Sequence, residues 1–206
     1  MRKADKALYL AKEKGKNRHI IYEERLHGKL ESDDMQNMAM AYAVSKEKKR
    51  EVITKMITEL CVSDVNSIVK KEERLQQIRS LFDLDGITIY SESGAQLVCR
   101  NGNYMVEVPD GRGLFEDEKY LALFGDDDNF IESNTLKLRS QDPAAFAVTQ
   151  EQEVGAALQC LSRKEGIPYT MVNFEVFNRN RKWSDEDITL LTILGHCIGN
   201  LLNYSE

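Results

Sequence analysis

The sequence has no long hydrophobic run. No stretch approaches the roughly 18 consecutive apolar residues that a membrane-spanning helix needs. Residues 1–16 alternate charged and apolar side chains, so they lack the continuous apolar core of a signal peptide. These absences predict an intracellular, cytoplasmic protein with no membrane partner.

Metal-binding and disulfide patterns are also missing. The chain has four widely separated cysteines: Cys61, Cys99, Cys160 and Cys197. No two of them form the C-x-x-C pair that is typical of structural zinc sites, and their spacing does not suggest a disulfide framework. The acidic run at residues 126–128 lacks the alternating ligands and the fixed glycine of a calcium loop. We therefore expect no metal, no cofactor and a solvated acidic loop.

The charge distribution excludes a further class of partner. The net charge is -6, yet residues 1–22 hold seven basic and two acidic side chains, so the remainder of the chain is clearly acidic. An acidic bulk argues against nucleic acid as the main partner. With 42% hydrophobic and 30% charged residues, the 206-residue chain has the composition of a globular protein that can form one domain plus an appendage.

The first third of the chain has helical periodicity. Apolar residues predict a helix within residues 4–14 that ends at Gly15, followed by a short strand at residues 19–22. A polar segment then leads into a second helix at residues 35–60. A third helix, with one apolar face, is predicted from residue 65 to residue 82.

After residue 86 the pattern changes to strands. Residues 86–90 and 95–100 predict a hairpin, and residues 104–108 a third strand. The intervening segments are predicted as a short helix at 114–124, a partly extended stretch at 130–138 and a helix at 142–152 with Pro143 in its first turn.

Two more strands are predicted at residues 157–163 and 169–177, on either side of a turn at 164–166. A helix is the alternative for the first of them, because Val154, Ala157, Leu158 and Leu161 also fit helical spacing. The side chains of residues 184–187 then cap an amphipathic helix at 186–202. Because strand follows strand with little helix between, the sheet is expected to be antiparallel.

The opening ADKALYLAKEKGKNRHIIY, residues 4–22, is similar to the last helix and strand of the GGDEF family of diguanylate cyclases. The resemblance implies that Lys12 and Lys16 would contact nucleotide phosphates in an intact parent cyclase. At Lys16 a lysine replaces the usual arginine, so bidentate phosphate contact is lost. The sequence holds no G-G-D-E-F loop, and two lysines on a lone helix cannot carry out phosphoryl transfer. We therefore expect no catalytic residue and no enzyme activity.

Residues 65–202 resemble a GAF domain in the order of their elements. The most telling segment is residues 166–187, GIPYTMVNFEVFNRNRKWSDED, which is similar to the family's last strand and its aromatic-Ser-x-Glu-Asp entry into the final helix. The resemblance implies an α+β fold with a central antiparallel sheet flanked by helices, and usually a small-molecule pocket. The predicted domains are a GGDEF fragment at 1–24, a helical linker at 25–62 and a GAF-like domain at 63–206.

Cyclic-nucleotide-binding GAF members carry an N-K…F-x-x-x-D-E motif, which this chain matches only in part. The matching positions are Asn178, Arg179, Trp183 and Asp187. Lysine becomes arginine, phenylalanine becomes tryptophan, and Ile188 stands in the last acidic position, so the departures argue against a cyclic nucleotide. Trp183 is expected to pack as a hydrophobic anchor, while the acidic residues after it favour the N-terminus of the helix.

The cysteines are expected to be core residues. GAF relatives that carry a bilin attach it through cysteine, and Cys99 and Cys160 lie on predicted strands. Free cysteine is among the most frequently buried residues, so core packing is the favoured interpretation. His196 and Cys197 are adjacent on the final helix and point in different directions, which excludes them as a catalytic pair.

A candidate ligand pocket follows from strand alternation. Met171, Asn173 and Glu175 share one face of the strand at 169–177, and a polar-studded face of a core strand indicates either a ligand pocket or solvent. Thr88 and Tyr90 on the first strand have the same mixed character, and Phe146 completes the predicted ligand-binding set. A solvent-facing sheet edge is the alternative.

These observations predict a regulatory, sensory GAF domain of a bacterial cyclic di-GMP signalling protein. It would bind an unidentified small molecule, or transmit a signal through a homodimer formed by its helices. One alternative is a ligand-free interaction and dimerisation module. Another is that the chain forms part of an active diguanylate cyclase only within a longer parent.

Overall fold

The computed structural model describes residues 7, 21, 47–59, 72–91, 94–100, 103–104 and 112–202. Within these ranges, only the backbone is described at residues 72–74, 94–100, 103–104, 112 and 202. The chain divides into two compact units, Met1–Val52 and Ile53–Glu206. Residues 47–59 are helical. The predicted GGDEF fragment, including Lys12 and Lys16, lies outside the described residues apart from positions 7 and 21.

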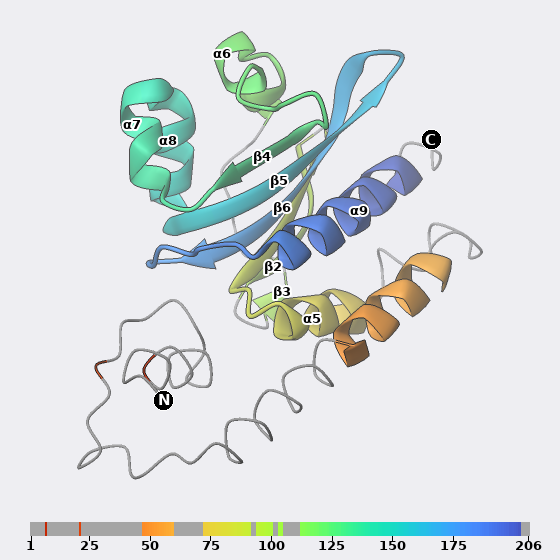
Figure 1. The fold of residues 1–206 in the computed structure, drawn as a ribbon. Coiled ribbons are helices and arrows are strands. Elements are labelled where there is room, and N and C mark those ends of the chain that lie inside the picture. The colour runs from red at the N-terminus through yellow and green to blue at the C-terminus, as the bar shows by residue number, and fades with distance from the viewer. Residues whose placement is uncertain are drawn as a thin grey trace. The chain divides into compact units, whose positions relative to one another are not determined.

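A single antiparallel sheet organises the second unit (Figure 1). Its six strands stand in the order β3-β2-β1-β6-β5-β4. The strands are β1 (Gly86–Ser91), β2 (Gly94–Arg100), β3 (Asn103–Tyr104), β4 (Asn129–Glu132), β5 (Val154–Lys164) and β6 (Ile167–Phe177). β1 and β6 pair at the centre although they are far apart in sequence, with Thr88 opposite Asn173. The predicted antiparallel sheet is confirmed.

The β5–β6 hairpin is defined by its turn. Lys164 pairs with Ile167, which leaves Glu165 and Gly166 as a two-residue loop. Both have positive φ, 54° and 84°, the backbone of the turn that matches the twist of paired strands. The helical alternative for this segment is therefore wrong. The alternating register, which places every second side chain on the same face, prevails over the helical spacing of Val154 and Leu158.

Helices cover both faces of the sheet (Figure 1). α9 (Asp185–Leu202) crosses one face and packs on β5 and β6, and α5 (Glu72–Leu81) lies on the same side, against β1 and β2. The other face carries α6 (Glu118–Leu121), α7 (Leu138–Gln141) and α8 (Pro143–Glu151). The 3-10 turns η1 (Arg112–Phe115) and η2 (Thr135–Lys137) complete the connections.

Most side chains on the face under α5 and α9, here called the apolar face, are buried and hydrophobic, among them Ile87, Ile89, Leu158, Cys160, Val172, Phe174 and Val176. The polar Ser162 and Thr170 are also buried there, near Gly199 of α9. α9 approaches closely because Gly195 has no side chain. A Cβ built there would lie 2.5 Å from Cys160 Sγ and 3.2 Å from Phe174 Cε2. This glycine and Gly199, where an added Cβ would clash with Ser162 Oγ, together allow α9 to come this near to the sheet.

The predicted elements between β3 and β5 were correct in part. The expected helix at 114–124 is the 3-10 turn η1 followed by the short α6, since Asp117 caps a new helix by accepting from the backbone N–H of Lys119 and Tyr120. The partly extended segment is β4 followed by η2. α8 begins as predicted, with Pro143 in its first turn and Asp142 as its N-cap.

In the part of the chain that the structure describes, no helix has both the length and the hydrophobicity required to cross a bilayer.

Candidate functional site

A pocket lies on the opposite face of the sheet, between β1, β5 and β6 and the segment η1–α8. Its polar lining residues are Tyr90, Tyr120, Thr149, Gln152, Gln159, Asn173 and Glu175. Its apolar lining residues are Leu114, Ala145, Val148, Val154 and Ala157. The recess measures about 330 Å³ when space open to solvent is included, and its free space is about 20 Å³, enough for about one water molecule.

The sheet positions the polar side chains of this pocket face by register. Gln159 of β5 pairs with Asn173 of β6, which in turn pairs with Thr88 of β1. Directly opposed residues share one face, so the three side chains form a row across the sheet. Leu161, Met171 and Tyr90 form the next row, in which the same register holds. The pocket floor is therefore polar in one row and largely apolar in the next.

Hydrogen bonds tie the polar floor to the segments that cover it. The Tyr120 hydroxyl donates to Gln159 Oε1 at 2.5 Å, and Gln152 Nε2 donates to the Tyr90 hydroxyl at 2.7 Å. Within the floor, Thr88 Oγ1 donates to Glu175 Oε2 at 3.0 Å. These bonds connect α6 and the end of α8 to the central strands.

Asn173 is the exception in this network. Its side chain is 4% exposed and lines the pocket, yet its Oδ1 is buried without a hydrogen-bond partner. Leaving a buried acceptor unpaired costs about 1–3 kcal/mol. The pocket has room for about one water molecule, and either that water or a bound group with a donor would complete this oxygen.

Burial governs the protonation of Tyr120 in the pocket wall. Burial raises the pKa of the Tyr120 phenol well above its ordinary value, against the lowering effect of the Gln159 hydrogen bond. Tyr90, Asp142 and Glu175 raise this pKa further. Negative neighbours disfavour the phenolate, so the Tyr120 hydroxyl stays protonated and remains a donor at physiological pH.

The structure brings together most of the predicted ligand-binding set. Tyr90, Asn173 and Glu175 line the pocket. Thr88 and Met171 lie fully buried on the same face, and Met171 Sδ is 3.8 Å from the Tyr120 hydroxyl. Phe146 lies on α8, half-buried, and is not among the pocket-lining residues.

Several pocket residues escaped the sequence analysis. The position of Gln159 could have been predicted from the sequence, because β5 alternates in the same way as β6 and the hairpin turn sets the register between them. Tyr120 and Gln152 were not, since their positions depend on how η1, α6 and α8 cross the sheet. Tyr120 belongs to an aromatic group above the sheet, with ring centroids 5.7 Å from Phe124 and 6.3 Å from Phe130.

The cysteines weighed as chromophore attachment points do not line this pocket in the described part of the chain. Cys160 belongs to the apolar face, beside Gly195, and burial raises the pKa of its thiol well above the ordinary value. The side chain of Cys99 and all of Cys61 lie outside the described residues. A buried, protonated thiol is unreactive, so the expected core role of Cys160 is confirmed.

Two other candidates have structural roles. His196 Nε2 lies 3.1 Å from the backbone oxygen of Asp127. Asp126 and Asp127 are exposed, while Asp128 forms an ion pair with Arg163 at 2.8 Å. Among the described residues, no group of three or more His, Cys, Asp or Glu side chains is placed to hold a metal ion.

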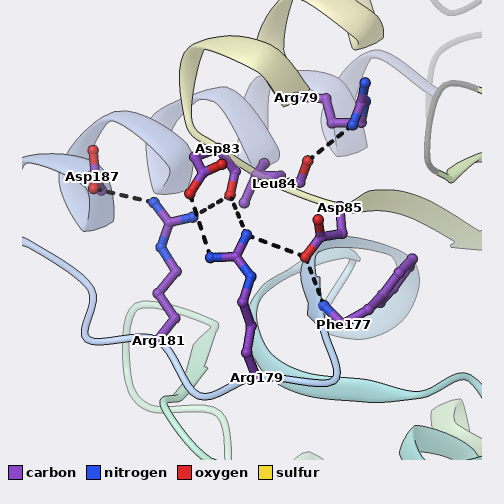
Figure 2. Close-up of polar contacts among 8 residues, drawn as sticks. All are labelled: Arg79, Asp83, Leu84, Asp85, Phe177, Arg179, Arg181 and Asp187. Atoms are coloured by element: carbon purple, nitrogen blue, oxygen red, sulfur yellow. Dashed lines mark hydrogen bonds and ion pairs between the residues drawn. The ribbon is translucent and has the colours of Figure 1, made fainter. Parts of the chain in front are cut away.

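A second polar assembly joins α5 to the β6–α9 connection (Figure 2). Its members, here called the arginine cluster, are Arg79, Asp83, Asp85, Arg179, Arg181 and Asp187. Arg181 donates to the backbone oxygen of Asp83 at 2.9 Å and contacts Asp187 at 3.4 Å. Arg179 bridges the carboxylates of Asp83 and Asp85, at 3.4 and 3.3 Å. The cluster thus links the end of α5 to the start of α9.

Trp183 packs against Arg181 of this cluster. Its ring is buried, 6% exposed, and its Nε1 donates to the Glu132 backbone oxygen at 3.3 Å. The guanidinium of Arg181 lies over the ring at 4.3 Å, a favourable cation–π geometry. The expected anchoring role of Trp183 is confirmed, and the partial motif matched in the sequence serves structure here.

Comparisons with known proteins were made by sequence and by structure. No family model matches the sequence, and no curated protein matches it either. Solved structures do match. A far-red-absorbing dark-state protein with bound biliverdin IXa aligns with 73% of this chain and 96% of its own, at a TM-score of 0.55 and 16% identity.

Two further structures extend this likeness. The chromophore-binding domain of the Stigmatella aurantiaca bacteriophytochrome aligns with 77% of this chain at a TM-score of 0.59 and 14% identity, and this chain spans 60% of its length. The GAF domain of an Acinetobacter phosphoenolpyruvate-protein phosphotransferase aligns with 77% of this chain and 94% of its own, at a TM-score of 0.53 and 11% identity. At these identities the likeness establishes the fold, and the chain has the GAF-like α+β fold that its sequence predicted.

Proposed function

We propose that this chain is a sensory, regulatory module whose GAF-like domain binds a small molecule in the pocket beneath α6–α8. The observation that carries the proposal is the polar floor of that pocket, above all the unpartnered Asn173 Oδ1. The apolar face, by contrast, is mostly hydrophobic. Structural neighbours that carry biliverdin or a chromophore-binding domain support a ligand on this fold.

A bilin is not the ligand that we propose. The described cysteine on a pocket-bordering strand, Cys160, belongs to the apolar face. The free space in the pocket holds about one water molecule, far less than a tetrapyrrole needs. A ligand much smaller than a tetrapyrrole, which would widen the pocket by displacing α8, fits these dimensions better than a bilin does.

The pocket can signal to the helices through the end of β6. The backbone N–H of Asp85 donates to the Glu175 backbone oxygen at 3.0 Å, and Asp85 Oδ2 accepts from the backbone N–H of Phe177 at 2.9 Å. Asp85 also belongs to the arginine cluster. A ligand that shifts Glu175 would therefore act on the junctions of α5 and α9, two candidate output elements.

We further propose that the output is a change in a homodimer formed through α9. Its outward side carries Ile193, 44% exposed, with the half-buried Leu190, Cys197 and Leu201 at helical spacing. A second copy of the same stripe would cover these side chains. Sedimentation velocity should show a dimer that dissociates in Ile193→Glu, whereas a monomeric wild-type protein at high concentration would contradict the proposal.

The biological context that we propose is bacterial cyclic di-GMP signalling, with no catalysis by this chain itself. It rests on the resemblance of residues 4–22 to the end of a GGDEF domain. In that context the GAF-like domain would regulate a cyclase present in a longer parent. Incubation of the purified chain with GTP and Mg²⁺ should yield no cyclic di-GMP, and any turnover would overturn this part of the proposal.

The direct test of ligand binding is a thermal-shift screen against nucleotides, amino acids and other metabolites. A ligand at 100 times its dissociation constant stabilises the protein by about 2.7 kcal/mol. The matched control is Val148→Trp, since Val148 is half-buried and lines the pocket. A true pocket ligand should stabilise the wild-type protein and leave the variant unchanged.

The small free volume of the pocket favours a second candidate, a ligand-free interaction module. In that case the polar floor is a structural remnant and the helices alone mediate association. It predicts that no compound in the screen stabilises the protein and that Val148→Trp retains full dimerisation. The first candidate predicts stabilisation by at least one compound.

A further inference from the structure

The pocket face is rich in hydrogen-bond acceptors. Asn173 Oδ1 lines the pocket, buried and unpartnered. The oxygens of Gln159 and Glu175 also act as acceptors, from Tyr120 and Thr88. A bound molecule with an N–H group would provide a donor for the Asn173 oxygen.

The charge of the pocket lining disfavours an anionic ligand. The described residues that line the pocket include the acidic Glu175 and no Lys, Arg or His. Asp142 and Glu175 both disfavour a negative charge on the Tyr120 hydroxyl, as the direction of its pKa shift shows. A carboxylate or phosphate entering this space would lose its hydration and meet negative neighbours, which is costly.

The shape of the lining favours a flat group. Tyr90 of β1 and Tyr120 of α6 are both buried and both line the pocket. Aromatic walls stabilise planar ligands through stacking and edge contacts. On one side the pocket is bordered by the half-buried Val148 and Thr149 of α8, so that helix is the element a ligand would displace.

Building on the pocket function proposed above, we infer that the ligand is a small planar nitrogen compound that presents N–H donors and carries no negative charge. An amide, an amidine or an amino-substituted heterocycle has this chemistry. One N–H donates to Asn173 Oδ1, while the plane of the group lies against the tyrosines. The Asn173 amide thus determines specificity.

Three probes of one shape test this inference on the full chain: benzamidine, benzamide and benzoate. They share a phenyl ring and differ in the planar head group, which is a cationic donor, a neutral donor or an anionic acceptor. Thermal shift and calorimetry should show stabilisation by benzamidine and benzamide and none by benzoate. Equal or tighter binding of benzoate would overturn the inference.

The role of Asn173 is tested with Asn173→Leu, which keeps the branched shape and removes the acceptor. Loss of one hydrogen bond to a buried group is expected to weaken benzamide binding about tenfold. The matched control is Ser162→Ala, which removes another unpartnered buried oxygen, next to Gly199 of α9 on the opposite face, and should leave binding unchanged. Unaltered benzamide affinity in Asn173→Leu would contradict the proposal.

Failure of this inference can be told from failure of the pocket function. An anionic metabolite that stabilises the wild-type protein and not Val148→Trp would overturn the ligand class and leave the pocket function standing. If neither the three probes nor the metabolite screen stabilises the protein, both proposals fail.

Discussion

The two faces of the central sheet are built from the same strands and differ in how many polar side chains they bury. On β6, Phe174 faces α9 among hydrophobic side chains, while its neighbours Asn173 and Glu175 face the pocket. All three side chains are buried, with no more than 4% exposed. Burial alone therefore does not distinguish the faces, whereas hydrogen bonding and charge do.

This difference separates stability from function within one element. Buried apolar groups contribute roughly 25 cal/mol for each Å² removed from water, whereas a buried polar group left without a partner costs about 1–3 kcal/mol. We infer that the apolar face supplies the stability that allows the pocket face to retain polar groups in its interior. Substitutions on the two faces should then have opposite consequences for stability and binding.

The largest effect is expected for Phe174→Ala. The ring is fully buried at the centre of the apolar face, between the paired residues Ile87 and Leu158. Its removal leaves a cavity, and such changes cost about 3–5 kcal/mol. Urea denaturation followed by circular dichroism should show this loss in the free energy of unfolding. A loss under about 1 kcal/mol would mean that the apolar face is not the main source of stability.

Arg181→Met tests whether charged contacts also hold the helices of the apolar face in place. The change keeps the alkyl stem and removes the guanidinium contacts with the Asp83 backbone oxygen, Asp187 and the Trp183 ring. Burial lowers the pKa of Arg181, and Asp187 and Asp83 offset this effect. Because the contacts are largely shielded from water, we expect a loss of about 1–3 kcal/mol.

The control for this change is Arg179→Met, in the same cluster. The Arg179 side chain is 42% exposed, against 11% for Arg181, and exposed ion pairs contribute about 0–1 kcal/mol. Chemical denaturation of the two variants side by side measures the difference. Equal losses would show that burial does not decide the strength of these contacts.

Gly195→Ala tests how closely α9 must approach the sheet. Alanine favours a helix over glycine by about 1 kcal/mol, yet the added Cβ would lie 2.5 Å from Cys160 Sγ and 2.8 Å from Cys160 Cβ. Overpacking of a core costs about 1–3 kcal/mol, so we expect a net loss of up to about 2 kcal/mol. Adding Cys160→Ala makes space and should restore most of it. A more stable Gly195→Ala single variant would disprove the tight packing.

The sequence was sufficient for the fold because the fold depends on local signals. The alternation in β6, the Glu165–Gly166 turn and the caps at Asp142 and Ser184 each specify one element, and the structure confirms them. Alternation also identified Asn173 and Glu175 as pocket residues. These positions needed no knowledge of distant contacts.

The rest of the pocket required long-range geometry. Tyr120 meets Gln159 across 39 residues, and Gln152 meets Tyr90 across 62. Such pairs depend on how the segments above the sheet cross it, which local periodicity does not specify. For the same reason, Arg179 and Arg181 were first considered only as parts of a ligand motif, while the structure shows them bound to the end of α5.

The smallest change in stability, and the sharpest test of the comparison, is expected for Asn173→Leu. Its neighbour Phe174 cannot be changed without a large loss, whereas Asn173 has a buried oxygen that is unpaired in the free protein. Replacing an unpaired polar group by an apolar one of the same shape is neutral or stabilising, by up to about 1 kcal/mol. The free energy of unfolding should therefore stay equal or rise while benzamide binding weakens. If Asn173→Leu instead destabilises the protein by 3 kcal/mol or more, about the loss predicted for Phe174→Ala, the asparagine supports the structure and the two faces do not divide stability from function.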